Sequence, residues 1–145
     1  MLAAGPLLKL LSAYLLLALC VVVHVVGMVA LFRALPNTGG HPGRPFAARV
    51  WLLVRLSWGI VLLNLVTIGV WALFFWRQGC LPDLRTVYDF SSMTYTTVGY
   101  GDVILAAEWW SMAGATFPTG MLMVGLSAAF FFAYLGPLLG QPQRA

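Results

Sequence analysis

The chain has 145 residues, of which 61% are apolar and 8% are charged, and its formal net charge is +4. Soluble domains average about 25% charged residues, so the composition excludes an ordinary soluble protein. A single domain of this length cannot bury so much apolar surface in a core of its own. We therefore expect a membrane protein whose surroundings are the lipid bilayer. Nucleic acid is not expected as a partner, because no soluble surface is left to carry a basic patch.

The first apolar run is Leu10–Phe32, which contains no formal charge. It exceeds the about 20 residues that a spanning helix needs. It is also longer than the apolar part of a signal peptide, which is roughly 7–15 residues, so a retained helix is expected. Within it, His24 is expected to form a hydrogen bond inside the bundle, with a proton sensor as the alternative. Residues 1–49 thus make an N-terminal unit of one helix and a loop.

The loop is expected over residues 33–49, which are rich in proline and glycine. A second spanning run follows from about Val50 to Trp76, with Asn64 in its middle as a candidate interhelical hydrogen-bonding residue. The cysteines Cys20 and Cys80 are not expected to pair and have no metal-ligand spacing.

A short helix is predicted from Pro82 or Asp83 to about Tyr95, because proline and an acid favour a helix start. It is too short to span and reads as a re-entrant helix. The third spanning run is Trp109–Leu135, continuing weakly to Leu139. Pro118 interrupts this run and should kink it.

Between the short helix and the third run, the chain reads Thr96-Thr97-Val98-Gly99-Tyr100-Gly101-Asp102. This string resembles the selectivity filter of potassium channels. The resemblance implies that K⁺ is bound by the backbone carbonyls of Thr97, Val98, Gly99 and Tyr100, with the Thr97 hydroxyl as the innermost ring. Gly99 and Gly101 accept a positive φ at no steric cost, which such a run of carbonyls requires.

Residues 50–139 resemble the whole pore module of this superfamily: outer helix, pore helix, filter and inner helix. The resemblance implies an all-α membrane protein that assembles as a homotetrameric, potassium-selective channel, with K⁺ as the permeating ion. No catalytic residue, enzyme activity or organic cofactor is expected. Neither is a voltage sensor or a cytoplasmic regulatory domain, and residues 140–145 form a short tail. The chain looks like a small prokaryotic three-span relative of the two-span channels.

The arginines support one orientation in a plasma membrane, which we expect to be a prokaryotic inner membrane. In the family the filter opens outward, which places the N-terminus outside, the loop 33–49 inside and the C-terminus in the cytoplasm. The positive-inside bias favours the same arrangement, because four arginines fall in or beside that loop: Arg33, Arg44, Arg49 and Arg55. The acids lie in one stretch around the filter: Asp83, Asp89, Asp102 and Glu108.

Asp102 and Glu108 are expected at the pore mouth, where acids raise the local cation concentration. Many family members carry a glutamate four residues before the first filter threonine, and this chain has Met93 there. Support for the filter is therefore expected from Thr94, Tyr95 and Thr96. Asp89 stands where many members have a tryptophan. It is either a solvated or capping acid, or a hydrogen-bond partner of Tyr100 or Asp102.

Pro118, Gly120 and Gly125 are candidate hinge residues in the third run, because proline removes a backbone hydrogen bond and glycine lowers the cost of bending. The alternative is that the glycines allow close helix packing.

The sequence also matches features of two other functions. A non-conducting membrane adaptor with a channel-like fold is compatible with the sequence. Gly99-Tyr100-Gly101-Asp102 with Tyr88-Asp89 also matches the signature pairs of intramembrane aspartyl proteases. Those enzymes place their two acids on separate spanning helices, and no spanning run separates Asp89 from Asp102 here.

Overall fold

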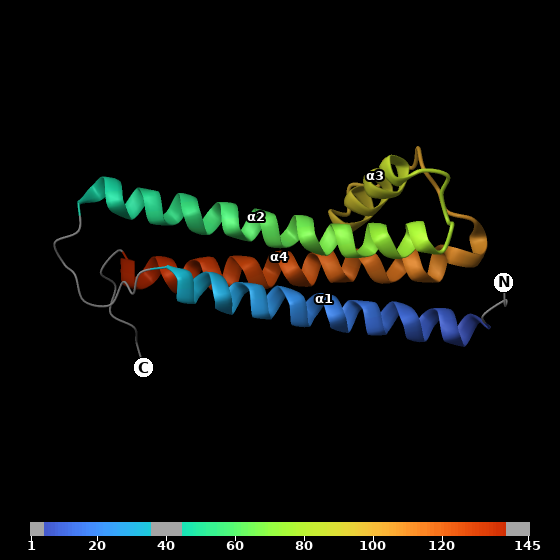
Figure 1. Ribbon diagram of the computed structural model, residues 1–145, viewed down its shortest axis with the longest axis horizontal. Helices are drawn as coiled ribbons and strands as arrows, with labels where there is room; N and C mark the ends of the chain where they lie inside the picture. The colour runs from blue at the N-terminus through green and yellow to red at the C-terminus, as the bar shows by residue number, and fades with distance from the viewer. Residues whose placement is uncertain (1–4, 36–44, 139–145) are drawn as a thin grey trace.

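The computed structural model describes residues 5–35 and 45–138, and every regular element in these ranges is helical. Three long helices lie side by side: α1 (Pro6–Ala34), α2 (Phe46–Arg77) and α4 (Trp110–Leu138). A short helix, α3 (Leu84–Tyr95), packs against one end of this bundle, and the 3₁₀ turn η1 (Ala107–Trp109) leads into α4 (Figure 1). The predicted element order is confirmed.

Three of these helices are long and apolar enough to cross a membrane, as predicted. The shortest of the three spans has 28 residues. At 1.5 Å per residue that exceeds the about 30 Å of bilayer hydrocarbon. With 12 residues, α3 is too short to span. The fold is therefore that of an all-helical, integral membrane protein with one short, non-spanning helix.

The loop predicted over residues 33–49 is too long at both ends. Arg33 lies in the last turn of α1, and Arg49 lies in the first turn of α2. Prolines mark both boundaries of the loop. Helix α1 ends before Leu35, which is extended and precedes Pro36 in the sequence, and α2 begins after Pro45, which is also extended. Arg44, the centre of the loop and residues 139–145 lie outside the described residues.

Helices α1 and α2 approach closely through two glycine notches. The side chain of Leu63 on α2 lies over Gly27 of α1, and the side chain of Leu31 on α1 lies over Gly59 of α2. Each helix thus offers a glycine and, four residues later, a leucine that fills the partner's notch. Small residues at such contacts let membrane helices pack without a hydrophobic driving force.

Asp83 is the N-cap of α3 and accepts a hydrogen bond from the Thr86 amide (2.9 Å) and from the Thr86 hydroxyl (2.8 Å). These hydrogen bonds hold the pKa of the Asp83 carboxyl below its usual range. The helix buries one face against α2, where the Phe75 and Phe90 rings meet edge to face at 5.5 Å. The start predicted at Pro82 or Asp83 is therefore confirmed to within two residues.

Polar side chains cross the helix interfaces at the two positions that the sequence singled out. The Tyr95 hydroxyl on α3 donates to Asn64 Oδ1 on α2 (2.8 Å), so the interhelical role of Asn64 is confirmed. His24 Nε2 on α1 lies 3.0 Å from Ser127 Oγ on α4, which confirms a hydrogen bond within the bundle.

Candidate functional site

Backbone conformation sets the TVGYG segment (residues 97–101) apart from the helices around it. Thr97 has φ +62°, Gly99 +48° and Gly101 +80°, while Val98 and Tyr100 between them have negative φ. The positive φ expected at the two glycines is confirmed. Thr97 was not anticipated, because a β-branched residue rarely adopts this region. Strain of this kind clusters at functional sites.

Amide groups of this segment are bound by the end of α3. The Thr97 amide donates to the Thr94 carbonyl (3.1 Å), and the Val98 and Gly99 amides donate to the Met93 carbonyl (3.0 and 3.3 Å). Met93 thus supports the segment through its backbone carbonyl. This role of the Met93 carbonyl could not be predicted from the sequence, because every residue has a backbone carbonyl.

Carbonyl groups of the same segment are free. Among the described residues, no hydrogen bond is donated to the carbonyl oxygens of Thr97, Val98, Gly99 or Tyr100. The sign of φ alternates along these residues, an arrangement that lets successive peptide dipoles point the same way. The segment therefore has its first amides bound to α3 and a row of carbonyl oxygens available as cation ligands.

The side chains of the segment are largely uncovered in a single chain. Val98 is 52% exposed and Tyr100 is 77% exposed, although both are large apolar groups. Uncovered apolar side chains beside a strained backbone indicate a surface that another chain or lipid covers.

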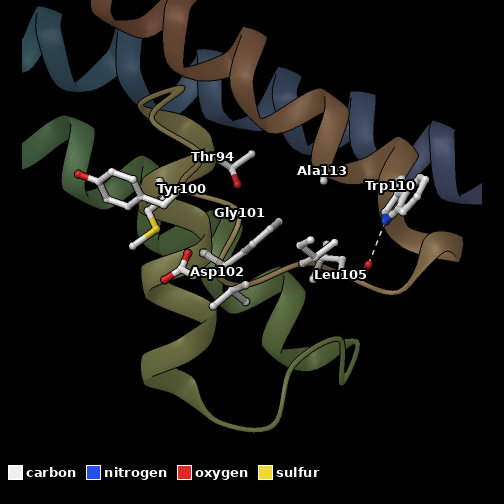
Figure 2. A pocket seen from close by; sticks show the side chains of 12 residues that line it. Thr94, Tyr100, Gly101, Asp102, Leu105, Trp110 and Ala113 are labelled. Carbon is white, nitrogen blue, oxygen red and sulfur yellow. Dashed lines mark hydrogen bonds between the residues drawn. The ribbon is translucent and has the colours of Figure 1, made fainter.

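Behind the segment lies a cavity of about 210 Å³, between α3 and the start of α4. Figure 2 shows Tyr100 and Trp110 at its two ends, with Thr94, Leu105 and Ala113 also on its wall. The Trp110 indole N–H donates to the Leu105 carbonyl (2.9 Å; Figure 2). This hydrogen bond ties the chain after the segment to the start of α4.

The expected supporting residues have different partners. Tyr95 is buried and reaches α2 through Asn64. The Thr96 hydroxyl donates to the Ser92 carbonyl of α3 (2.7 Å). Thr94 lies on the cavity wall. The predicted support by these three residues is thus compatible with their positions.

The acids expected at the mouth differ in their surroundings. The carboxylates of Asp89 and Asp102 are exposed and make no hydrogen bond within the described residues, so the alternative of a hydrogen bond from Asp89 to Tyr100 or Asp102 is not seen within one chain. Glu108 forms an ion pair with Lys9 on α1 (3.2 Å), and the same ammonium lies 4.1 Å from the Trp109 ring centroid. Nearby, burial raises the pKa of Cys80 to about 11, which keeps this thiol protonated.

The two candidate hinge glycines are not equivalent. A Cβ added at Gly120 would collide with the backbone carbonyl of Tyr95, so Gly120 is where α4 packs directly on the end of α3. A Cβ at Gly125 would meet no atom within 4 Å. The helix runs through Pro118 without interruption. Close packing therefore explains why residue 120 is a glycine. It does not explain the glycine at position 125, which stays a candidate hinge.

In comparisons with protein-family models, with curated proteins and with solved structures, no significant match was found.

Proposed function

We propose that four copies of this chain form a potassium-selective channel in which residues 96–102 are the filter. One observation carries the proposal: the TVGYG string combines alternating signs of φ with four consecutive carbonyls that accept no hydrogen bond from the described residues. A dehydrated K⁺ ion requires oxygens in place of its water shell, and rings of backbone carbonyls supply them. The ion is the cargo, and no other cofactor is part of the proposal.

In this proposal α2 is the outer helix, α3 the re-entrant pore helix and α4 the inner helix. The C-terminal end of α3, where a helix carries partial negative charge, adjoins the filter. Asn64 on α2 holds that end through its hydrogen bond with the Tyr95 hydroxyl, and α4 packs against the same end at Gly120. The carbonyl of Met93, in the last turn of α3, binds the filter amides. The filter therefore stands on a short helix fixed on two sides, as an ion site with demanding geometry needs.

Four copies are part of the same proposal. One chain contributes one row of carbonyls, and the potassium filters that this string resembles are built from four such rows around one axis. Assembly also gives the uncovered Val98 and Tyr100 side chains a place behind the neighbouring filters. A native mass measurement on purified protein should give a tetramer. A stable dimer with no larger species would contradict the proposal.

The membrane arrangement belongs to the same proposal. The end with the filter segment carries all four acids but also Lys9, Arg77 and Arg85, whereas Arg33, Arg49 and Arg55 lie toward the other end of the long helices, and the sequence adds Arg44 between α1 and α2 and Arg144 after α4. The positive-inside bias then favours a filter that faces outward from a plasma membrane, with the C-terminus in the cytoplasm.

Ion flux tests the function. Full-length protein in liposomes loaded with K⁺ should release K⁺ down its gradient once a counter-ion path is provided, and empty liposomes should not. A correctly assembled tetramer without flux would favour the non-conducting adaptor. The protease alternative gains no support from the fold, since only the end of α3 and an extended segment lie between Asp89 and Asp102.

A further inference from the structure

Helix α1, which stands outside the proposed pore module, contacts α4 or the turn before it at three levels. Near the filter end, Lys9 pairs with Glu108 in η1. In the middle, His24 meets Ser127. At the far end, the Phe32 ring packs against Tyr134 with centroids 5.5 Å apart. Helix α1 therefore packs against α4 along its length (Figure 1).

The middle contact is the only polar one of the three that is fully buried. His24 has no exposed surface and Ser127 is 4% exposed. Its neighbourhood on the two helices is largely apolar, with Met28 one turn along α1 and Met123 one turn back on α4, both buried. His24 Nδ1 is buried and has no partner among the described residues, so the contact of Nε2 with Ser127 is the one hydrogen bond that the ring makes there. Separation of the two helices would leave both groups unpaired where water is absent.

Ser127 also occupies a particular place on α4. Gly120 fixes the first half of the helix against the Tyr95 carbonyl. Gly125, with open space around it, follows five residues later, and Ser127 comes two residues after Gly125. Glycine lowers the cost of bending a helix. Any bend of α4 at Gly125 would move Ser127 relative to His24.

We propose that His24 and Ser127 form a latch through which α1 holds the second half of α4, and that this latch sets the balance between two positions of that half. The inference rests on the proposed channel function, in which α4 is the inner helix. His24 is a positioning residue that acts through Ser127 and touches no ion.

The test is single-channel recording of full-length protein in planar bilayers. His24→Leu and Ser127→Ala each remove the hydrogen bond. Both should shift the open–closed equilibrium in the same direction, by about threefold or more, given the usual strength of such bonds in membranes. The double variant should shift it no further than one single variant does, because only one interaction is lost.

Conservative variants separate a latch from mere packing. His24→Gln and Ser127→Thr each retain a hydrogen-bonding group and should return the equilibrium toward that of the wild type. Ser57→Ala is the matched control, because Ser57 is exposed and its one hydrogen bond within the described residues goes to the Leu53 carbonyl of its own helix. It should leave the equilibrium unchanged.

The possible failures are distinguishable. Wild-type K⁺ current with unshifted or independently additive variants would overturn the latch and leave the channel intact. Shifts that the conservative variants do not restore would also overturn it. If the wild-type tetramer carries no current, the proposed function falls and the latch falls with it.

Discussion

Backbone strain is concentrated between Thr97 and Gly101, where three of five residues have positive φ. Glycine tolerates this conformation, whereas Thr97 must be held in it by the hydrogen bonds from α3. The rest of the fold offsets the free-energy cost of these positive φ values. This indicates that the function of the segment depends on its backbone conformation.

Gly99→Ala should abolish potassium selectivity. A Cβ at φ +48° costs roughly 1–2 kcal/mol per chain, so the carbonyl on each side should move out of position. The check is the ratio of K⁺ to Na⁺ permeability in bilayers. Gly79→Ala is the matched control: it has φ +68° and open surroundings, but it lies in the turn after α2. It should lower stability to a similar degree and keep selectivity. Normal selectivity in Gly99→Ala would show that this segment is not the filter.

Gly120→Ala should disrupt the protein, since its Cβ would collide with a backbone carbonyl that cannot move independently of α3. Overpacking of this kind typically costs about 1–3 kcal/mol. Gly125→Ala adds a methyl group to open space and should raise stability by up to about 1 kcal/mol through helix propensity. Thermal unfolding and tetramer mass in detergent are the measurements. A stable, assembled Gly120→Ala protein would contradict the packing role.

Side chains that need a partner were easier to predict than backbone contacts. A lone histidine or asparagine in an apolar helix must find a hydrogen bond, so His24 and Asn64 were recognisable from the sequence. The carbonyl of Met93 and the neighbour of Gly120 were not, because they depend on how α3 and α4 meet in space. For the same reason, the sequence alone could not decide whether Gly120 and Gly125 serve as hinges or allow close packing.

At the scale of elements, α3 depends on its cap. The helix has 12 residues, a length at which isolated helices are marginal, so its stability comes from Asp83 and from the face packed on α2. These two interactions therefore set the position of α3, and the TVGYG segment begins where α3 ends.

Acid should weaken the cap of α3. The pKa of Asp83 is lower in the folded protein than in the unfolded chain, owing to the Thr86 amide and hydroxyl. The ionised cap therefore stabilises the fold above the unfolded pKa, and this stabilisation is lost as pH falls through the folded pKa. Melting temperatures of wild type and Asp83→Asn, measured against pH, should differ most near neutrality and converge in acid. A constant difference across that range would exclude this linkage.

Element boundaries were predicted well where the sequence contains a strong local signal. Proline at position 82 and aspartate at 83 placed the start of α3, and the apolar runs placed the cores of the three long helices. The end of α1 and the start of α2 were misplaced, because the charged residues Arg33 and Arg49 were assigned to the loop. Arginine is a good helix former, and both residues lie in helices. The prolines at positions 36 and 45 were the better markers.

Across the whole molecule, charge differs between the two ends, and one acid at the filter end is already neutralised. Lys9 lies within 3.2 Å of Glu108, whereas Asp102 has no cationic partner among the described residues. The two acids that the sequence placed together at the mouth are therefore unequal in the field they present to a cation.

Asp102→Asn should lower single-channel conductance at low salt, and much less at high salt, because the Debye length falls from about 30 Å at 0.01 M to about 3 Å at 1 M. Glu108→Gln should have a smaller effect at low salt, since Lys9 already offsets the charge. Conductance of both variants at the two salt concentrations is the measurement. Equal effects of Asp102→Asn at both concentrations would argue against surface electrostatics.

The reversal potential with K⁺ on one side of a planar bilayer and Na⁺ on the other tests the central claim most directly. If the free carbonyls of Thr97 to Tyr100 replace the water shell of K⁺, current through the purified protein should reverse far from zero, on the side set by the K⁺ gradient. Reversal at zero, or the absence of current from an assembled tetramer, would contradict the account.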